Sequence, residues 1–582
     1  MARRARTVWW PLLLVVAALL SCTADPPPLV PRSDAAPPLP PAPGEIVVGV
    51  DDLAGGFNPH TLADLTPSGM AVAGLLLPSA FRQGAGGGWQ LDGTLLESAR
   101  VSDTDPFTVT YRIRVDASWS DSAPIAAEDF GYLADQMRTQ PGVVNGAGYQ
   151  LIDEVVSRDG GKTVQVVFRA PYPGWRSLFH HLLPAHLLKD APGGWASALD
   201  DGVPVSGGTF VLTSADPARR EVVLARNDRY WDTPAVADRL VLRQLPADEL
   251  AVALRTGGVQ AALFGHPDAI TTALLTGTGA TPPIVVPQPV VAHVALRPAG
   301  SPLDEPAVRA AVAAALDRTS LIATGAASGP SAGLVANAQV LAPSQPGYRP
   351  TAPDTGPPVR PDPAAVARLL TEAGYLREDG VWTRGGDPLE LVVAAPANRD
   401  PYPVLAIRVA AQLQQAGIGA LVVTPPADEL FGAMTGGELS VGDAVSTTMP
   451  RPVGEGGTES GTAGVDIAVV PQPAGADPAT VLASAHGCPL VVPADAAMAE
   501  PNTADVCDPE LQPLIGSALT GQAPVDAVLA AVEPQLWARA VALPLYQHAS
   551  LLVTTPELSG VSPGPLLEGP LDGAARWRKS RR

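Results

Sequence analysis

The second half of the chain repeats one pattern, a capped helix followed by a short apolar strand, and this pattern limits the possible folds more than any other feature. Asp362 followed by Pro363 marks a helix start, because an aspartate cap with proline in the first turn is favoured there. Another helix is predicted from Pro403 to about Gly417, and an apolar strand follows at residues 420–424. Helices that alternate with strands indicate an α/β fold.

The first half of the chain contains more strands. Residues 45–50 form a short apolar run, which predicts a buried strand. Residues 107–115 alternate apolar and polar side chains, which predicts a half-buried strand with one inward face. The inward side chains are expected to be Phe107, Val109, Tyr111, Ile113 and Val115. A helix over residues 126–137 and a strand over residues 163–168 are expected to follow.

Composition limits both the size class and the partners. A length of 582 residues is enough for about two to four domains of roughly 150 residues each. With 46% hydrophobic and 16% charged residues the chain can bury a sizeable core. The formal charge of -20 argues against nucleic acid as a partner, because affinity for a phosphate backbone comes mostly from clustered positive charge.

The N-terminus predicts an extracytoplasmic, lipid-anchored protein. Three arginines precede an apolar run at residues 8–20, which is too short to span a bilayer that needs about 20 residues. Residues 1–21 therefore read as a signal peptide. The sequence Leu-Leu-Ser-Cys that ends at Cys22 resembles the lipobox of bacterial lipoproteins, so Cys22 is the expected lipidation site. An ordinary cleaved signal with an incidental cysteine is the alternative.

The segment that follows Cys22 is expected to be an extended tether at residues 22–44. Nine of the 21 residues at positions 24–44 are proline, a composition that favours polyproline II and does not collapse into a core. The tether would hold the folded part away from the extracytoplasmic face of the cell membrane.

Cys488 and Cys507 are the two cysteines that remain after Cys22. An even pair in an oxidising compartment predicts one disulfide, which closes a loop of about 20 residues and contributes about 3 kcal/mol in the chain-entropy model. Two cysteines do not make a zinc site alone, and no histidine stands at ligand spacing from them. No metal or other cofactor is expected.

The catalytic motifs in the sequence are weak. Ser331 lies in a GxSxG pattern, but a nucleophile elbow needs a strand before the serine, whereas a helix end precedes this one. A serine hydrolase is therefore a remote alternative. His180, His181 and His186 are expected to be ordinary surface or partly buried histidines, because Pro184 interrupts any helix between them. The glycine run at residues 84–88 predicts a hairpin loop rather than a dinucleotide site. Residues 434–464 have no sustained periodicity and are expected to form a loop.

Several segments in a fixed order resemble the family 5 solute-binding proteins, the dipeptide, oligopeptide and nickel receptors of ABC importers. The strand at residues 107–115 runs into Trp119 and SDSAPIAAEDF, which is similar to a tryptophan, turn and helix of that family. Further on, VSGGTF and then EVVLARNDRYWDTPAVADRLVLR resemble a glycine turn and the family signature L-x-R-N-x-x-Y-W. The resemblance covers about residues 45–565.

This resemblance implies a bilobed periplasmic-binding-protein-like α/β fold of type II, with an extra subdomain in lobe one. Lobe one would comprise residues 45–285 together with residues 545–575, and lobe two residues 286–544. The ligand would be enclosed when the lobes close. The resemblance therefore implies a monomeric binding protein that acts without catalysis.

The resemblance also suggests candidate ligand contacts. They are Phe57 and Asn58 in the first loop, Tyr402 before a helix of lobe two, and Gln472 after a strand of lobe two. For each of them, packing or exposure to solvent is an equally valid interpretation.

One departure from the family pattern bears on the ligand. The family's peptide receptors commonly hold the ligand ammonium with an aspartate in the loop after a strand of lobe two. Here Ala474, Gly475 or Ala476 occupies that position, and Asp477 matches the aspartate-proline step that starts the next helix. A buried ammonium without a partner is costly, so this departure argues against a peptide ligand.

Two functions on the same architecture stay open. The first is a substrate-binding protein of an ABC importer, with a permease as partner and a small molecule or peptide as ligand. The second follows from stretches such as GFNPH, DPFTVTYRIR and ARNDRYW, which resemble actinobacterial lipoproteins with this fold. Those lipoproteins act in the control of phosphatidylinositol mannoside and lipoarabinomannan synthesis, which implies a glycolipid ligand or an envelope glycosyltransferase as partner. The fold alone does not decide between the two functions.

The chain ends in a basic segment at residues 576–582. Five of its seven residues are basic: Arg576, Arg578, Lys579, Arg581 and Arg582. The segment is expected to be a solvated tail, with contact to an anionic membrane surface as the alternative.

Overall fold

The computed structural model describes residues 44–53, 55–275, 280–298, 300–434, 439–440, 462–488, 502 and 506–580. The predicted signal peptide, Cys22, the predicted tether up to residue 43 and most of the predicted loop at residues 434–464 lie outside the described residues. Among the residues that are described, no helix combines the length and the apolar character needed to cross a bilayer.

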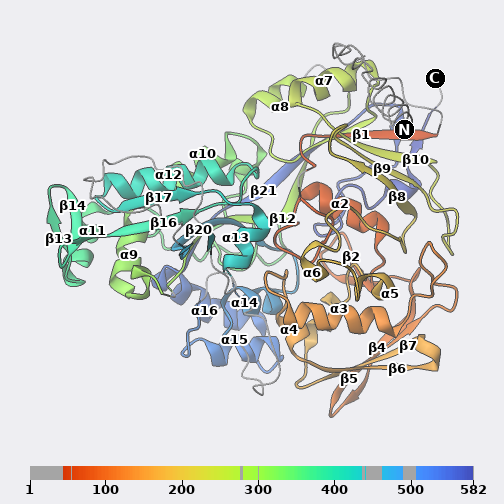
Figure 1. Ribbon diagram of the computed structural model, residues 1–582, viewed down its shortest axis with the longest axis horizontal. Coiled ribbons are helices and arrows are strands. Elements are labelled where there is room, and N and C mark those ends of the chain that lie inside the picture. The colour runs from red at the N-terminus through yellow and green to blue at the C-terminus, as the bar shows by residue number, and fades with distance from the viewer. Residues whose placement is uncertain are drawn as a thin grey trace, which may run out of the picture. The chain divides into compact units, whose positions relative to one another are not determined.

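A mixed ten-stranded sheet is the centre of the fold (Figure 1). Its strands, in spatial order, are β17 (Gly419–Val423), β16 (Glu390–Ala394), β20 (Ile467–Pro473), β12 (Ile284–Leu296), β21 (Ala542–Thr554), β11 (Ala261–Phe264), β1 (Glu45–Val50), β10 (Arg239–Gln244), β9 (Glu221–Arg226) and β8 (Phe210–Asp216). Helices accompany both halves of this sheet, so the predicted α/β class is confirmed.

Two long antiparallel strands join the halves of the sheet. β12 and β21 have 13 residues each and pair with each other, with register shifts between Pro287 and Val291 and between Ala292 and His293. One end of β21 pairs with β11 of the first half, and one end of β12 pairs with β20 of the second half. The predicted lobe boundaries at residues 285 and 544 fall inside these two strands. Movement of one half relative to the other would therefore act on this strand pair.

The first half of the sheet is covered on both faces. The strand predicted at residues 45–50 is present as β1, which pairs in parallel with β10 and β11. Because successive side chains of a strand point to opposite faces, Val47 packs with α7 (Ala247–Thr256), whereas Val48 packs with α2 (Pro67–Leu76). Helix α8 (Ala269–Leu275) follows β11.

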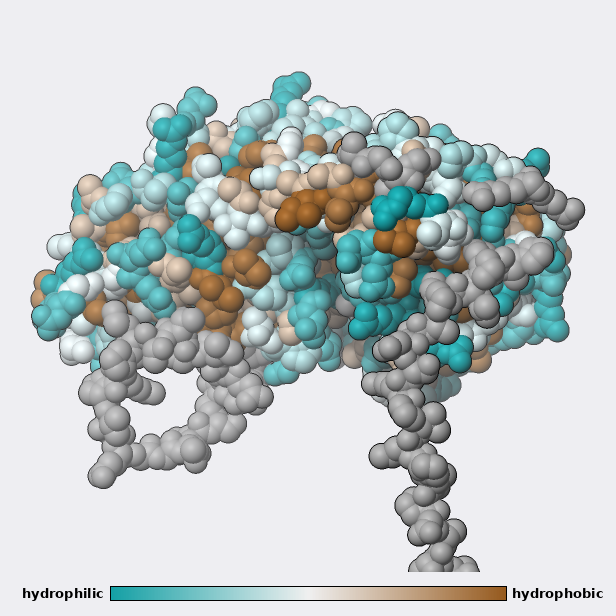
Figure 2. All heavy atoms as spheres, turned by 90° about the horizontal axis from the view of Figure 1, so that it is seen from above, coloured by the Kyte–Doolittle hydropathy of each residue, from teal (hydrophilic) through white to brown (hydrophobic). Residues whose placement is uncertain are grey.

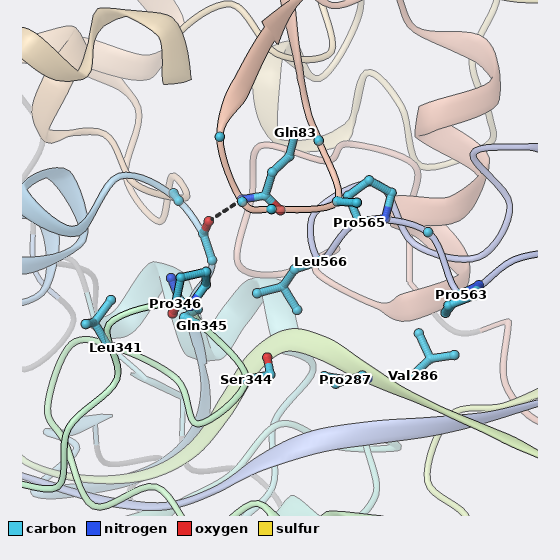
Figure 3. A pocket seen from close by; sticks show the side chains of 18 of the residues that line it. Gln83, Val286, Pro287, Leu341, Ser344, Gln345, Pro346, Pro563, Pro565 and Leu566 are labelled. Carbon is cyan, nitrogen blue, oxygen red and sulfur yellow. Dashed lines mark hydrogen bonds between the residues drawn. The ribbon is translucent and has the colours of Figure 1, made fainter.

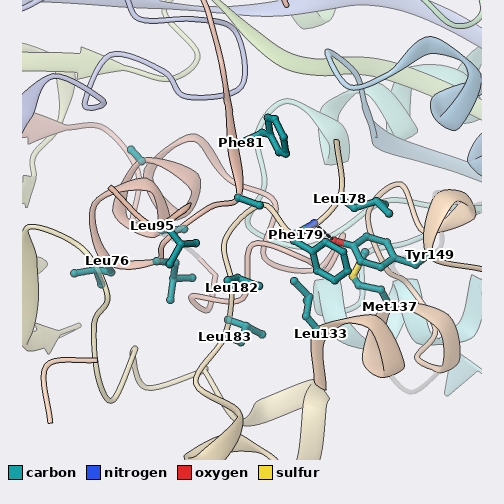
Figure 4. Close-up of a cluster of buried hydrophobic side chains, with 14 of the residues drawn as sticks. Leu76, Phe81, Leu95, Leu133, Met137, Tyr149, Leu178, Phe179, Leu182 and Leu183 are labelled. Atoms are coloured by element: carbon teal, nitrogen blue, oxygen red, sulfur yellow. Dashed lines mark hydrogen bonds between the residues drawn. The ribbon is translucent and has the colours of Figure 1, made fainter. Parts of the chain in front are cut away.

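A four-stranded subdomain lies beside the first half, in the order β4 (Leu96–Thr104), β5 (Phe107–Ile113), β7 (Thr163–Phe168) and β6 (Ile152–Arg158). The helix predicted over residues 126–137 is present as α3 (Ala127–Thr139), which packs on this subdomain and buries its Leu133 and Met137. Figure 4 shows these two side chains close to Tyr149 and Phe179. The inward assignment of Val115 is wrong, because β5 ends at Ile113 and Val115 is 80% exposed.

The short elements of the first half connect these layers. They are the hairpin strands β2 (Phe81–Gln83) and β3 (Trp89–Leu91), the helices α4 (Ala147–Gln150), α5 (Ala185–Leu188) and α6 (Gly194–Ser197), and the 3-10 turns η1 (Asp159–Gly161) and η2 (Pro173–Ser177).

The second half is the helix-rich part of the sheet. Its helices are α9 (Pro306–Ala315), α10 (Arg318–Ala326), α11 (Pro363–Glu372), α12 (Tyr402–Gln415) and α13 (Ala427–Met434), with the small strands β13 (Leu376–Glu378), β14 (Val381–Arg384) and β15 (Asp387–Pro388). Asp362 caps α11 as predicted, because its carboxylate accepts from the N–H groups of Ala364 and Ala365 at 3.0 Å. The strand predicted at residues 420–424 is β17, one residue earlier.

Three helices near the C-terminus pack into the core of the first half, although they lie in the predicted lobe two. They are α14 (Pro478–His486), α15 (Gln512–Leu519) and α16 (Val525–Arg539). Buried Val481, Ile515 and Val532 share one cluster with Phe168 and Tyr172 of the subdomain region. A disulfide between Cys488 and Cys507 links the end of α14 to the segment before α15.

The C-terminal segment is ordered up to residue 580, so the expectation of a solvated basic tail is wrong for residues 576–580. Trp577 is fully buried, and β23 (Arg578–Lys579) pairs with β22 (Leu558–Ser559). Burial of the indole ring removes a large apolar area from water and fixes the segment, while the flanking Arg576 and Arg578 stay exposed.

Candidate functional site

A cavity of about 430 Å³ lies where five separate segments of the chain meet (Figure 3). These segments are the β2–β3 hairpin, the start of β12, the loop at residues 341–346, the turn before α14, and residues 563–566. The lining residues are Gln83, Gly84, Ala85, Gly86, Gly87, Gly88, Val286, Pro287, Leu341, Ser344, Gln345, Pro346, Gly475, Ala476, Pro478, Pro563, Gly564, Pro565 and Leu566. A volume of this size is typical of small-ligand sites.

None of the residues that line this cavity is acidic or basic. Gln83, Ser344 and Gln345 supply its polar side chains, and glycine, proline, alanine, valine and leucine supply the rest. The glycines leave main-chain groups close to the cavity because they have no side chain to cover them. The cavity therefore suits neutral polar and apolar groups.

The glycine-rich wall is the hairpin that the sequence predicts at residues 84–88. β2 and β3 pair from Phe81 with Leu91 to Gln83 with Trp89, and the N–H of Gly84 donates to the carbonyl of Gly88 at 2.8 Å. Gly87 has a φ of +79°, a conformation that favours glycine.

Gln83 connects three of the segments around the cavity. Its side-chain Nε2 donates to the carbonyl of Gly475 at 2.9 Å, and its Oε1 accepts from the N–H of Leu567 at 3.1 Å. Its own main-chain N–H donates to Glu568 Oε1 at 2.8 Å. Gln83 thus fixes the hairpin, the turn before α14 and the C-terminal segment relative to one another, as Figure 3 shows for Gly475.

The turn before α14 sends no carboxylate into the cavity. Asp477 caps α14, because its carboxylate accepts from the N–H of Thr480 at 3.0 Å and from the hydroxyl of Thr480 at 2.8 Å. Ala474 is buried, and Gly475 and Ala476 line the cavity. The proposed helix-capping role of Asp477 is confirmed. The turn at which the sequence resemblance places the acid of peptide receptors is lined by neutral residues here.

A buried ionic network lies behind the hairpin. Glu568 contacts His180 Nε2 at 3.2 Å and Arg82 Nη1 at 3.3 Å, and Arg82 also pairs with Asp92 at 2.7 Å. Burial alone would raise the pKa of Glu568, but His180, Arg82 and the N–H of Gln83 outweigh this effect and hold its pKa at about 2. Glu568 is therefore ionised at neutral pH and holds the C-terminal segment against the hairpin.

The four ligand contacts suggested by the sequence do not line this cavity. Asn58 is buried, and its side chain shapes the first loop by accepting from the N–H of His60 at 3.1 Å. Phe57 is half-buried against the core of the first half. Tyr402 is buried and its hydroxyl pairs with His548 Nε2 at 2.9 Å, whereas Gln472 is half-buried and pairs with Val291 in the sheet. Contact of these residues with a ligand stays a prediction.

The lining residues could not be picked out from the sequence, because few of them are the aromatic or polar side chains that usually mark a binding site. Most of the wall is glycine and proline from segments that are far apart in the sequence. The glycine run at residues 84–88 was a visible signal for one wall of the cavity.

The weak catalytic motifs have structural roles. Ser331 is buried in the 3-10 turn η4 (Pro330–Gly333), where its hydroxyl accepts from the N–H of Ala549 at 3.0 Å. His186 pairs with Asp121 at 2.8 Å near the surface, and His180 belongs to the ionic network. Within the described residues, no group of histidine, cysteine, aspartate and glutamate could hold a metal ion.

The two sheet halves, the strand pair that joins them and the cavity between distant segments together define a solute-binding protein of the bilobed kind. Comparison with known proteins agrees: residues 90–442 match the sequence model of "Bacterial extracellular solute-binding proteins, family 5 Middle". The chain belongs to this family, as the sequence resemblance predicts. Proteins of this family bind solutes and are not enzymes.

Individual relatives fall in two groups. The chain is 36% identical, over 97% of its length and 97% of the relative, to a Mycobacterium tuberculosis protein described as "Probable monoacyl phosphatidylinositol tetramannoside-binding protein LpqW". It is 27% identical to "Oligopeptide-binding protein OppA" of Mycobacterium bovis, over 60% of this chain and 58% of that protein. Among solved structures, the oligopeptide-binding protein AppA of Bacillus subtilis, in complex with a nonapeptide, superposes with a TM-score of 0.72. At 15% identity, covering 94% of this chain and all of AppA, this match concerns the fold.

Proposed function

We propose that this protein is a lipid-anchored extracytoplasmic binding protein that encloses the neutral polar part of a glycolipid between two lobes, without catalysis. The observation that carries the proposal is the 430 Å³ cavity, whose lining includes no charged side chain. The lobes would be residues 45–285 with 545–575, and residues 286–544, except that α14, α15 and α16 pack in the core of the first half and would move with it. The two lobes would close about β12 and β21.

The lining of the cavity argues for hydroxyl groups over a peptide terminus. A ligand ammonium enclosed here would lose its hydration without gaining a carboxylate partner, which costs several kcal/mol. Sugar hydroxyls can instead donate to and accept from the amide of Gln345, the hydroxyl of Ser344 and main-chain groups of the glycine hairpin. Neutral hydrogen bonds of this kind need no buried counter-charge.

The similarity to LpqW supports the same ligand class. That relative is described as binding a monoacyl phosphatidylinositol tetramannoside, and it matches nearly the full length of both chains. We favour the form of the proposal in which the protein acts in the control of envelope glycolipid synthesis with a glycosyltransferase as partner, as the sequence resemblance to actinobacterial lipoproteins implies. A peptide receptor coupled to an ABC permease is the second candidate, which the similarity to OppA supports and the uncharged cavity disfavours.

The ligand proposal predicts that the mature protein, gently extracted from membranes, retains a glycolipid. Native mass spectrometry should show a bound mass that fragments into hexoses, and a mixture of short peptides should leave the melting temperature within about 1 °C. A retained peptide, or a peptide that raises the melting temperature only when its N-terminal ammonium is free, would instead establish the second candidate.

The anchor proposal predicts that Cys22 carries the lipid. Replacing it, as Cys22→Ala, should abolish incorporation of labelled palmitate and release most of the protein from the membrane fraction, because acyl chains supply the membrane affinity. Cys488→Ala is the matched control, since it removes another cysteine and should leave palmitate incorporation unchanged. Equal labelling of the Cys22→Ala variant would refute the anchor.

A further inference from the structure

A second, smaller space lies on the other side of Leu566 from the cavity. It is a crevice of about 40 Å³, and it shares the wall of Val286, Pro287 and Leu566 with the larger cavity. Its lining residues are Leu65, Thr66, Pro67, Met70, Ala71, Leu263, Val286, Pro287, Gln288, Pro289, Val290, Ser550, Leu566, Leu567, Glu568, Gly569 and Pro570. Figure 3 shows Leu566 near Val286 and Pro287.

The crevice is apolar in practice, because its polar side chains already have partners. Gln288 Nε2 donates to the carbonyl of Gly265 and to the hydroxyl of Ser550, both at 2.7 Å. The carboxylate of Glu568 is held by Arg82, His180 and the N–H of Gln83. Aliphatic groups supply most of the remaining surface. An alkyl chain bound there would therefore leave no polar side chain without a hydrogen-bond partner.

The partition between the two spaces belongs to a tight turn, residues 563–570, which we name the C-terminal strap. Gly564 and Gly569 have φ values of +71° and +70°, and the N–H of Gly569 donates to the carbonyl of Pro565 at 2.8 Å. The strap is fastened through Leu567 and Glu568 to the β2–β3 hairpin. The side chain of Leu566 makes no hydrogen bond, so its rotamer can change while the strap stays fastened.

We propose that the cavity and the crevice form one site for a single-chain amphiphile, with the neutral head in the cavity and the start of the alkyl chain passing Leu566 into the crevice. This inference rests on the proposed function of the cavity and adds the part of the ligand that the cavity does not hold. At about 40 Å³ the crevice exceeds the roughly 10–15 Å³ that one water needs, so it takes only the first methylenes while the strap stays in place.

The test uses n-alkyl β-D-maltosides of one, two, four and eight carbons below their micelle concentrations, and maltose as the head alone. Titration calorimetry on the mature protein should show an affinity that rises over the first methylenes, by up to about fourfold for each one that becomes buried, and then levels off once the crevice is full. Ala71 lines the crevice but not the cavity, so Ala71→Leu should remove the dependence on chain length and keep maltose affinity within about twofold. Leu566→Ala widens the passage and should strengthen binding of the long chains.

Adsorption of detergent to the surface requires a control, because Figure 2 shows apolar residues exposed in patches on one face. Leu274 of α8 is 41% exposed and lies outside both spaces, so Leu274→Ala should change nothing. The two-part site is overturned if affinity does not depend on chain length in the native protein, or if neither Ala71→Leu nor Leu566→Ala alters that dependence. If maltose binds but chain length has no effect, the two-part site is wrong and the proposed function still stands. If the proposed function is wrong, native mass spectrometry should instead show a retained peptide.

Discussion

Acidification from pH 7 to pH 4 is expected to destabilise this protein by several kcal/mol, because several of its histidines are buried in uncharged form. Burial lowers the pKa of His60 and His486 to about 4 and that of His293 to about 3, from an ordinary value of 6.5. The pKa values of His181 and His548 are also lowered well below 6.5, chiefly by burial.

The direction of the effect follows from proton binding. Between pH 6.5 and about 4 the unfolded chain binds protons on these histidines and the folded chain does not, so stability falls as the pH falls through this range. A lowering from 6.5 to about 4 corresponds to roughly 3 kcal/mol for each histidine. Asp129 opposes this loss, because burial raises its pKa to about 6 and its folded form takes up a proton first. Burial also raises the pKa values of Asp51, Asp64, Asp466, Asp572 and Glu533, so these carboxyl groups oppose the loss in the same way. The net loss is therefore smaller than the sum over the histidines.

His486 offers the clearest variant for this prediction. It is buried at the end of α14, and neither of its ring nitrogens has a hydrogen-bond partner in the described part of the chain. His486→Leu should therefore keep or raise the melting temperature at pH 7, since it removes an unpaired buried polar group. It should also weaken the decline of the melting temperature between pH 6.5 and pH 4.5. The prediction fails if the native protein melts at one temperature across this range.

His186→Leu is the matched control for this experiment. His186 lies near the surface, with 29% of its side chain exposed, and pairs with Asp121. Its removal should leave the pH dependence of the melting temperature close to that of the native protein. Equal effects of the His486 and His186 variants would show that burial is not the cause.

The sequence predicted those parts of the fold that depend on local patterns. The strand at residues 45–50, the aspartate cap of α11 and the glycine hairpin at residues 84–88 are signalled by side chains close together in the sequence. The role of Asp477 was also visible, because an aspartate before proline marks a helix start.

The cavity could not be predicted from the sequence, because tertiary packing brings its walls together. The side chain of Gln83 forms hydrogen bonds with Gly475 and Leu567, which lie almost 400 and almost 500 residues further along the chain. No local sequence pattern predicts these contacts. For residues 576–580 a local pattern misled the prediction. Their basic charge favours a solvated tail, but burial of Trp577 fixes the segment against the fold.

Loss of the Glu568 carboxylate is the second large effect that we expect. Glu568→Ala should reduce the free energy of unfolding by about 3 kcal/mol, because removal of one partner from a buried ion pair leaves the others desolvated and unpaired. In this variant Arg82 would still pair with Asp92, and 29% of the Arg82 side chain is exposed to solvent. The expected loss therefore lies at the lower end of the cost of breaking a buried ion pair. The N–H of Gln83 and the ring of His180 lose their shared acceptor.

The same variant should weaken ligand binding, because Glu568 fastens the strap that carries Leu566 to the hairpin. Glu568→Gln keeps an acceptor for Gln83 but loses the charge, so an intermediate loss of stability is expected. Since the pKa of Glu568 is held at about 2, below its ordinary 4.5, the native contribution is present above pH 4.5 and is lost as the pH falls towards 2. The Gln variant should lack this acid dependence.

An exposed acid provides the comparison that separates burial from charge. Glu372 pairs with Arg368 one helical turn away, and more than half of each side chain is exposed. Glu372→Ala should cost less than about 0.5 kcal/mol, because solvent screens such pairs. Denaturant unfolding of the three variants at pH 7 measures these differences. If Glu568→Ala costs no more than Glu372→Ala, Glu568 does not hold the strap, and the cavity wall that depends on the strap must be held by Gln83 alone.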